Sequence, residues 1–482
     1  MTAISPPSKT DPVVIVGAGI FGLSTAIHLA QRGYTKVTVF DRQPYEKTLY
    51  SYTEGCDAAS ADINKIIRSA YGSQTEYQEL TAEALKIWNA WHEELRLGGA
   101  AVPPGMTSDD VVWINNGNIS LTDADTLPGF ERDTVQGMEA AGHRGTQLIN
   151  NEEDHLRLAE EKGFAEAMQP FSKKLLGVLD TTGGTAIADK ACRFALHKAK
   201  SLGVQFVLDP KAGRFKSTIE DASGKVTGIR TADGKFHAAA MTIVACGGWT
   251  PTLVPDLDGL AETTAGSVVI LKLPESSPLR KRFSASRFPA WTFKIRDGAE
   301  GGLYGFPADE NGHLKIGYRG TKYTNPRAQA DGVERSEPIT RWTEGESLKK
   351  IPEQALTVIR KFLDDYLPEL GAEGIDIWLT RLCWYNDSYD NHYVIDRVQG
   401  KKGLMVATAG SGHAFKYLPN IGSWVVDIME GVGLDRPAVK AWQWREKKAG
   451  ETAPNKLMEG SRSRKALGNV PLVSVDAPKE RL

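Results

Sequence analysis

A strand, a glycine-rich turn and a helix near the start of the chain constrain its fold more than any other feature. The β-branched run Val13–Val16 predicts a buried strand. Three glycines follow in the pattern GxGxxG, at Gly17, Gly19 and Gly22. Apolar residues over 21–32 recur at helical spacing, and a second strand over 37–40 ends at Asp41. This complete βαβ unit predicts an α/β fold with a Rossmann-type domain.

The same unit predicts a dinucleotide site. Its glycines would make the tight turn, let the backbone approach a pyrophosphate and let the helix pack closely on the strand. The helix N-terminus attracts anions, and Asp41 would accept hydrogen bonds from a ribose. One βαβ unit does not separate FAD from NAD, and a turn without a ligand is the alternative. The cofactor-binding residues that the unit predicts are Gly17, Gly19, Ile20, Phe21, Gly22, Asp41 and Arg42.

Composition narrows the class of protein. The chain has 482 residues, with 58 Lys and Arg against 60 Asp and Glu, for a net charge of −2. Near-neutral charge disfavours a general nucleic-acid binder and a binder of acidic membranes. The apolar stretch over 13–30 contains three glycines and His28, so a strand, a turn and a helix explain it better than a membrane span. The length predicts two or three domains.

The cysteines are few and widely spaced. Cys56, Cys192, Cys246 and Cys383 form no CxxC pair, so neither a zinc site nor a disulfide framework is expected, and no metal site is predicted. A reducing, intracellular compartment fits this pattern. Free cysteines are most often buried structural residues, and Cys192 and Cys246 are interpreted in that way.

Cys383 differs because of the residues around it. The segment from Arg381 to Asp396 reads RLCWYNDSYDNHYVID. It resembles the flavin-attaching segment of the monomeric sarcosine oxidase family, which includes pipecolate oxidase, saccharopine oxidase and the fungal fructosyl amino acid oxidases. In that family the matching cysteine is bonded to the 8α-methyl carbon of the flavin. The resemblance implies FAD bound covalently through Cys383, with Arg381 favouring the reactive thiolate.

Other segments follow the family's order along the chain and imply further flavin contacts. Residues 243–249 (IVACGGW) resemble the second FAD-contacting segment, and residues 60–72 resemble the loop and helix beside the flavin ring. Residues 410–422 (GSGHAFKYLPNIG) resemble the family's SGHxFK turn. The cofactor-binding residues that these segments add are Ser60, Lys65, Ala245, Gly247, Trp249, Gly412, His413, Phe415 and Lys416.

The resemblance also implies residues that act on the substrate and on oxygen. Arg68 and Lys416 match the family's residues that bind the substrate carboxylate. Lys315 follows Tyr304 by the same step as in sarcosine oxidase, where the lysine lies against the flavin and promotes its reaction with oxygen. Arg445, in the segment WQWR, matches an arginine of the fructosyl amino acid oxidases that binds the substrate carboxylate.

Two positions depart from the family pattern. Arg319 stands where sarcosine oxidase has His and the fructosyl amino acid oxidases have Glu, which disfavours a fructosyl substrate. The final residues, Glu-Arg-Leu, differ from the Ser-Lys-Leu peroxisomal signal, so both the cytoplasm and the peroxisome stay open. The catalytic residues expected from all these comparisons are Lys315, Tyr304, Arg68, Lys416, Arg319 and Arg445.

The function expected is that of an FAD-dependent oxidase of N-substituted (secondary) amino acids. Hydride would pass from the carbon next to nitrogen to the flavin, the imine would be hydrolysed, and O2 would be reduced to H2O2. A fructosyl amino acid oxidase and a flavin amine dehydrogenase that avoids oxygen are the alternatives. Four cations around the substrate would favour a ligand with several carboxylates, because unpaired buried charge is costly. These cations are Arg68, Lys416, Arg319 and Arg445.

The motifs also suggest how the chain divides. A discontinuous FAD-binding domain is expected over residues 11–96, 180–265 and 376–435. An α+β substrate domain with a mostly antiparallel sheet is expected over 97–179 and 266–375, followed by a partly ordered C-terminal segment over 436–482. The expected partners are an amino-acid substrate and O2, without nucleic acid or membrane, and the protein is expected to be a monomer.

Overall fold

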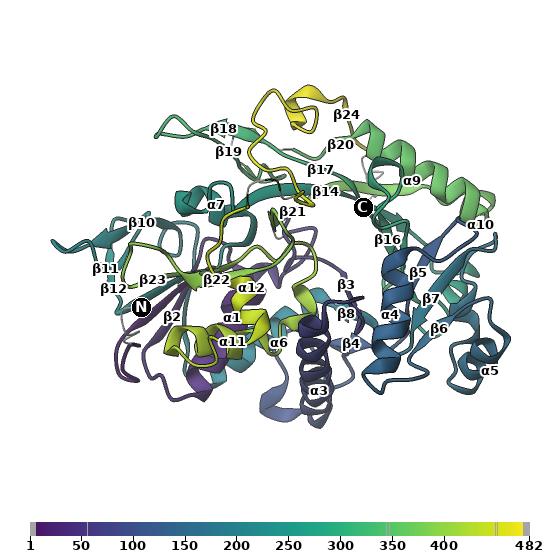
Figure 1. Cartoon of the computed structure of the whole chain (residues 1–482), viewed down its shortest axis with the longest axis horizontal. Helices are drawn as coiled ribbons and strands as arrows, with labels where there is room; N and C mark the ends of the chain where they lie inside the picture. The colour runs from purple at the N-terminus through teal and green to yellow at the C-terminus, as the bar shows by residue number, and fades with distance from the viewer. Residues whose placement is uncertain are drawn as a thin grey trace.

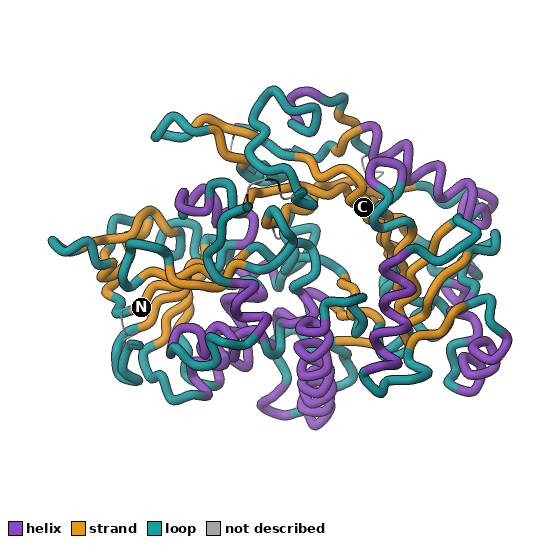
Figure 2. Tube along the Cα trace, viewed as in Figure 1, coloured by secondary structure: helices purple, strands orange, loops and turns teal. Residues whose placement is uncertain are grey.

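Two large β-sheets organise the chain, one at the left of Figure 1 and one running from the top to the right. Figure 2 shows their strands in orange. The computed structural model describes residues 6–54, 56–343, 345–346, 348–448, 450 and 452–475. Within these ranges no helix is both long and apolar enough to cross a membrane.

The first sheet has six strands in the order β22-β23-β13-β1-β2-β9, and all neighbours are parallel except β22 with β23. Val16 at the end of β1 pairs with Val244 at the end of β13. The prediction that residues 13–41 and 242–246 share one parallel sheet is therefore confirmed. The strands are β1 (Val13–Val16), β2 (Val37–Asp41), β9 (Gln205–Leu208), β13 (Met241–Val244), β22 (Val394–Arg397) and β23 (Leu404–Thr408).

Helices pack around this sheet, and the first of them, α1, lies where the apolar spacing over 21–32 predicted a helix. A Cβ added at Gly422 would overlap the backbone of Ser24, so the two helices that contain these residues, α1 and α11, cross in backbone contact. Together with α3, α6 and α12 they share one apolar core, which contains Trp88 and Trp442. The helices of this half are α1 (Ile20–Gln31), α2 (Tyr45–Thr48), α3 (Thr75–Leu97), α6 (Ala188–Ser201), α7 (Thr250–Leu253), α11 (Ile421–Glu430) and α12 (Pro437–Trp442).

The second sheet has eight strands in the order β21-β14-β17-β16-β15-β5-β7-β6. It is antiparallel except where β15 pairs with β5, which confirms the mostly antiparallel sheet expected from the sequence. The strands are β5 (Asn118–Thr122), β6 (Gln147–Ile149), β7 (Leu176–Asp180), β14 (Ala261–Lys272), β15 (Ala290–Phe293), β16 (Leu303–Gly305), β17 (His313–Tyr323) and β21 (Ile377–Ser388).

The pairing of β21 differs from the expected division of the chain. Ala261 at the start of β14 lies opposite Ser388 at the end of β21, so both long strands belong entirely to the eight-stranded sheet. Residues 261–265 and 376–388 were expected in the FAD-binding domain. Long antiparallel strands joined by many backbone hydrogen bonds override a boundary drawn from motifs alone. The division into two domains remains a prediction.

Smaller sheets and the remaining helices surround these two. The sheets are β3-β8-β4, β10-β11-β12, β18-β19 and β20-β24. Their strands are β3 (Asn64–Ile67), β4 (Trp113–Ile114), β8 (Gly184–Ile187), β10 (Phe215–Glu220), β11 (Val226–Thr231), β12 (Phe236–Ala238), β18 (Pro326–Ala328), β19 (Glu334–Ser336), β20 (Ile351–Pro352) and β24 (Leu472–Val473). The helices are α4 (Gly129–Ala140), α5 (Glu153–Glu161), α8 (Leu279–Arg282), α9 (Glu353–Tyr366) and α10 (Pro368–Ala372).

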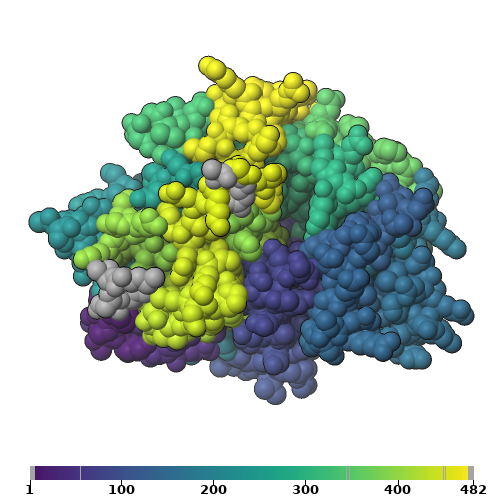
Figure 3. All heavy atoms as spheres, in the orientation of Figure 1, coloured from purple at the N-terminus to yellow at the C-terminus, as the bar shows by residue number. Residues whose placement is uncertain are grey.

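The C-terminal part of the chain packs across the surface of the protein. Figure 3 shows it in yellow over the middle of the face in view. Val473 of β24 pairs with Ile351 of β20, and the Asn455 side chain donates to the Ser388 carbonyl over 2.7 Å. The segment is thus tied to the eight-stranded sheet. The last seven residues, including the terminal tripeptide, lie outside the described part.

Candidate active site

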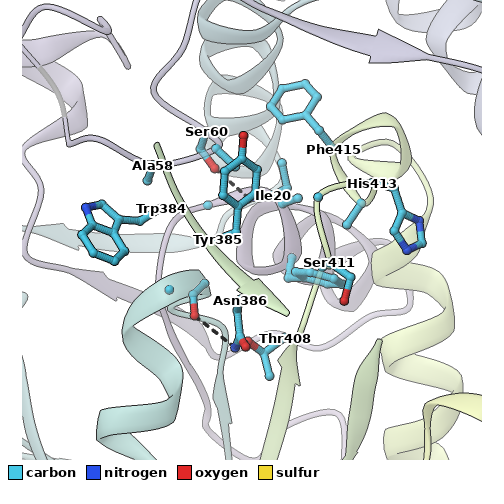
Figure 4. A pocket seen from close by; sticks show the side chains of 18 of the residues that line it. Ile20, Ala58, Ser60, Trp384, Tyr385, Asn386, Thr408, Ser411, His413 and Phe415 are labelled. Carbon is cyan, nitrogen blue, oxygen red and sulfur yellow. Dashed lines mark hydrogen bonds between the residues drawn. The ribbon is translucent and has the colours of Figure 1, made fainter. Parts of the chain in front are cut away.

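A cavity of about 760 Å³ lies between the two large sheets. Its walls come from the carboxyl ends of β1, β2, β13 and β23 and from side chains of β16, β17 and β21. Open α/β sheets bind ligands at the carboxyl ends of their parallel strands, so this is where the βαβ unit predicts a dinucleotide. In Figure 4, Ala58 and Trp384 lie on one side of the view and His413 and Phe415 on the other, with Tyr385 between them.

The three glycines of the first turn have different roles. Gly17 has φ +107°, and a Cβ there would overlap the Ala245 carbonyl, so β1 and β13 approach each other closely at the cavity wall. Gly19 lines the cavity at the start of α1. Gly22 does not line the cavity. It faces the turn instead, where a Cβ at Gly22 would overlap the Gly17 carbonyl. Gly22 therefore lets α1 pack closely on the turn, and the helix N-terminus stays open toward an anion.

Asp41 ends β2 at the cavity. Its two carboxylate oxygens accept hydrogen bonds from the backbone N–H groups of Ala18 (2.7 Å) and Gln43 (2.8 Å). Burial raises the pKa of Asp41, and these two N–H groups oppose that effect. Arg42 places its guanidinium carbon 4.9 Å from the Trp249 ring centroid, and both side chains line the cavity. A carboxylate beside a helix N-terminus and a glycine turn fits the ribose and pyrophosphate of a dinucleotide.

A buried carboxylate organises the basic residues at the other end of the cavity. Asp62 is almost fully buried and accepts from Lys315 (2.8 Å) and Arg381 (2.6 Å), and it also pairs with Lys65. Burial raises the pKa of Asp62, but the three cations outweigh burial and hold that pKa far below its usual range. Lys315 donates a second hydrogen bond to the Asn64 carbonyl over 2.7 Å. Arg381 also lies 3.8 Å from the Asp57 carboxylate, which pairs with Arg341. Four cations around two carboxylates make this end of the cavity positively charged.

Lys315 and Cys383 lie behind the cavity wall instead of lining it. Both side chains are fully buried. The Lys315 ammonium is 4.5 Å from the ring centroid of Phe306, a lining residue. Cys383 lies on β21 directly before Trp384, which lines the cavity, and it packs with Ile63 in a small apolar cluster. The expected sites of oxygen reaction and flavin attachment are thus one side chain removed from the open space.

Arg319 lines the cavity, but its charge is neutralised. Its guanidinium donates to both oxygens of Asp387 over 3.0 and 2.8 Å and stacks 3.8 Å above the Tyr385 ring. Asp387 is fully buried, and Arg319 helps to lower its pKa to about 2 against the effect of burial. The Tyr385 hydroxyl lies 3.0 Å from that of Tyr304. Tyr385 and Asp387 were not predicted as site residues, although both stand in the segment that contains Cys383.

Arg68 and Lys416 meet at one end of the cavity. The Arg68 guanidinium carbon lies 4.6 Å from the Tyr71 ring centroid and the Lys416 ammonium lies 4.4 Å from it. Lys416 also donates to the Tyr71 hydroxyl. Burial, followed by the charge of Arg68, lowers the pKa of Lys416 well below its usual value. Two cations that share one aromatic side chain make a strong site for a carboxylate.

Arg445 is not at the cavity, which corrects its expected role. It forms a bidentate pair with Asp390 (2.7 and 2.6 Å) and donates to the carbonyls of Tyr393, Gln443 and His392. These hydrogen bonds hold the segment after α12 against the residues that precede β22. The sequence match at WQWR therefore identifies a residue that stabilises the fold here.

The predicted site residues fall into two groups, those that line the cavity and those that do not. Those that line the cavity are Gly17, Gly19, Ile20, Phe21, Asp41, Arg42, Ser60, Lys65, Arg68, Ala245, Gly247, Trp249, Tyr304, Arg319, Gly412, His413, Phe415 and Lys416. Those that do not are Gly22, Lys315, Cys383 and Arg445. Sequence reasoning missed Arg296, Tyr71 and Phe130, which also line the cavity. Only Tyr71 stood in a segment that had been singled out, and no pattern marks Arg296 or Phe130.

Comparison with known proteins identifies the family. A family model described as "DAO: FAD dependent oxidoreductase" matches residues 12–428. L-saccharopine oxidase of Schizosaccharomyces pombe is 27% identical over 444 residues, which cover 90% of this chain and 93% of that protein. N-methyl-L-tryptophan oxidase of Salmonella typhi is 23% identical over 431 residues, covering 87% and 94%.

Solved structures share the fold. Fructosamine oxidase (Amadoriase II) from Aspergillus fumigatus has a TM-score of 0.75 at 24% identity and covers 98% of both chains. A modified fructosyl peptide oxidase from Aspergillus nidulans has a TM-score of 0.75 at 25% identity and covers 96% of this chain and 99% of its own. The glycine turn, Asp41 and the cavity fit FAD, and these findings confirm the resemblance drawn from the sequence. The chain belongs to the DAO family of FAD-dependent oxidoreductases.

Proposed function

We propose that this protein oxidises N-substituted (secondary) amino acids and reduces O2 to H2O2. One observation supports this most: a single cavity joins a dinucleotide cradle to a pair of cations, Arg68 and Lys416, suited to a carboxylate. Bound FAD supplies the redox chemistry by accepting a hydride from the carbon next to nitrogen and passing two electrons to oxygen. The protein supplies position and charge.

The chain's own residues orient the substrate. The planar Arg68 guanidinium binds a carboxylate through two parallel N–H groups, and the Lys416 ammonium adds a point charge from the SGHxFK turn. These cations also lower the pKa of a nearby substrate amine, because a like charge disfavours the protonated form. A neutral amine has the lone pair that expels hydride from its neighbouring carbon. Tyr71 and Phe130 exclude water from this end.

Lys315 is proposed to act on oxygen through its charge. Its ammonium is fixed by Asp62 and by the Asn64 carbonyl at the basic end of the cavity. A fixed positive charge stabilises the negative charge that oxygen gains in the first electron transfer. Asp62 therefore positions Lys315, and Lys65 and Arg381 add to the positive field.

We also propose covalent attachment of the flavin through Cys383. The thiol packs in one cluster with Tyr385, which lines the cavity, and Arg381 on the same strand is within the cationic cluster. The structure contains four free cysteines in its described part, which supports a reducing compartment, in the cytoplasm or the peroxisome. We expect the enzyme to work as a monomer.

Two alternatives differ in substrate or acceptor. A fructosyl amino acid oxidase is disfavoured by Arg319, which stands where those oxidases have Glu and which pairs with Asp387. A dehydrogenase that avoids oxygen is disfavoured by Lys315. Peroxide release distinguishes an oxidase from the dehydrogenase. The substrates that are oxidised distinguish the proposed enzyme from a fructosyl amino acid oxidase.

The purified yellow protein is expected to release peroxide with secondary amino acids and not with primary ones. A panel of saccharopine, N-methyl amino acids, pipecolate and fructosyl amino acids, read by a peroxidase-coupled assay, measures this. Turnover confined to fructosyl substrates would favour the fructosyl amino acid oxidase. Flavin reduction without peroxide would favour the dehydrogenase.

Replacing Arg68 with Gln is expected to lower kcat/KM by about 10²-fold, because the substrate carboxylate loses its bidentate cationic partner. Steady-state kinetics on the best substrate of the panel measures it, and Arg68→Lys should recover part of the loss. Arg360→Gln, which removes an exposed pair with Asp376, is the control. An unchanged kcat/KM in Arg68→Gln would remove Arg68 from carboxylate binding.

A further inference from the structure

Arg296 adds a third cation at the end of the cavity that contains Arg68. It follows β15 and lines the same space. Its guanidinium carbon lies 3.4 Å from the ring centroid of Phe130, and that of Arg68 lies 5.7 Å from the same ring. The two arginines therefore border one aromatic side chain of α4. Neither the motifs nor the resemblance predicted Arg296.

Positive charge exceeds negative charge here. Glu131 is largely buried, and its Oε1 accepts from Arg296 over 3.3 Å and from the Ser120 hydroxyl over 2.9 Å. In the part of the chain that the structure describes, no other carboxylate lies at ion-pair distance from Arg296, and none does from Arg68 or Lys416. Burial and the charge of Arg68 lower the pKa of Arg296 to about 10. Asp180 shares a small cavity with Arg68 and Glu131, but its oxygens already accept from Ser69 and Thr182. Three cations thus face two carboxylates that are both engaged, and this balance of charge favours an anionic ligand.

The cations that the sequence had suggested for this purpose are satisfied elsewhere. Arg319 is paired with Asp387 and Arg445 with Asp390, each through two hydrogen bonds. Neither needs a substrate carboxylate. The excess charge is thus concentrated around Phe130, at the expected Arg68 and the unexpected Arg296, and not at Arg319 or Arg445.

We propose that Arg296 binds the second carboxylate of a dicarboxylic secondary amino acid whose first carboxylate is held by Arg68 and Lys416. Because both guanidinium groups border Phe130, the two carboxylates are separated by a short carbon chain, as in aspartate or glutamate. Phe130 and Glu131 hold the Arg296 guanidinium in place, while its side chain keeps 42% of its surface exposed, so it can still receive a ligand. This inference rests on the proposed function and names its substrate class.

Two substrates that differ by one charge test it. N-methyl-L-glutamate and N-methyl-L-glutamine have the same shape at the distal group, and steady-state peroxide release gives kcat/KM for each. The wild type is expected to prefer the glutamate compound by about 10- to 100-fold. Arg296→Gln should lower kcat/KM for the glutamate compound to that for the glutamine compound and leave the latter nearly unchanged. Arg296→Lys should keep part of the preference.

Binding gives a readout independent of turnover. Glutarate and butyrate differ by one carboxylate, and each can be titrated against the flavin absorbance of the holoenzyme. Glutarate is expected to bind the wild type about 10-fold more tightly than butyrate does. The two compounds should bind Arg296→Gln with equal affinity. Arg287→Gln, which removes an exposed pair with Glu166 outside the cavity lining, is the control and should keep the difference.

The outcomes separate the two proposals. Equal binding of glutarate and butyrate to the wild type would overturn the dicarboxylate site, even if secondary amino acids are oxidised. An equal loss for both compounds in Arg296→Gln would show that Arg296 only supports the fold, and would also overturn it. Tighter binding of glutarate without oxidation of any secondary amino acid would retain the site and reject the proposed function.

Discussion

Replacing Lys315 with Met is expected to slow the reoxidation of reduced flavin by oxygen by about 10²–10³-fold, while flavin reduction stays within about 3-fold of the wild type. The ammonium is fully buried and is held by Asp62 and the Asn64 carbonyl. A charge fixed in this way requires no reorganisation when oxygen becomes negative. Stopped-flow mixing of reduced enzyme with oxygenated buffer measures the reoxidation rate.

The pH dependence gives a second signature. Burial, followed by the charges of Lys65 and Arg381, lowers the pKa of Lys315 to about 7, although Asp62 opposes the shift. The active form is the ammonium, which is present below the pKa. Wild-type reoxidation should therefore decrease as pH rises through about 7, and Lys315→Met should lose this dependence.

A matched control keeps the interpretation specific. Lys190 is also largely buried and pairs with two carboxylates, Asp110 and Glu310, but it does not line the cavity. Lys190→Met should leave reoxidation unchanged. If Lys315→Met reoxidises within about 3-fold of the wild type, its charge has no part in the oxygen reaction.

The elements that position the cofactor could be predicted because their signals are local. The GxGxxG turn, the helical spacing over 21–32 and the strand ending at Asp41 all act within one short segment. The position of β13 beside β1 could also be predicted, because residues 243–249 resemble a second flavin-contacting segment. The structure places these segments on one cavity wall.

The partners of the cations could not be predicted, because pairing depends on the register of distant strands. Arg319 on β17 and Asp387 on β21 are 68 residues apart and meet only because both strands flank β14. The sequence therefore counted Arg319 as an unpaired cation. Arg296 shows the opposite case, since a lone arginine in a loop has no motif and acquires its place only when Phe130 of α4 comes to lie against it.

The flavin of the wild-type protein is expected to remain with the polypeptide after acid denaturation, and Cys383→Ser should release it. The sulfur of Cys383 is buried on β21 in an apolar cluster with Ile63 and Tyr385, and Tyr385 lines the cavity. A serine hydroxyl keeps the volume but is a much weaker nucleophile than a thiolate. Acid precipitation followed by absorbance of pellet and supernatant shows which fraction holds the colour.

Mass spectrometry and a second cysteine make this test decisive. The linked wild-type chain should have the mass of the polypeptide plus one FAD less two hydrogens, one from the thiol and one from the flavin methyl group. The two electrons and two protons of these hydrogens reduce O2 to H2O2. Cys246 lines the cavity near the glycine turn, where its burial raises the pKa of its thiol above its usual value, so it is a poor nucleophile. Cys246→Ser should keep the flavin attached. Yellow colour in the wild-type supernatant would show that the flavin is held by contacts alone, and the charges of the Asp62 cluster would then account for its retention without a bond to Cys383.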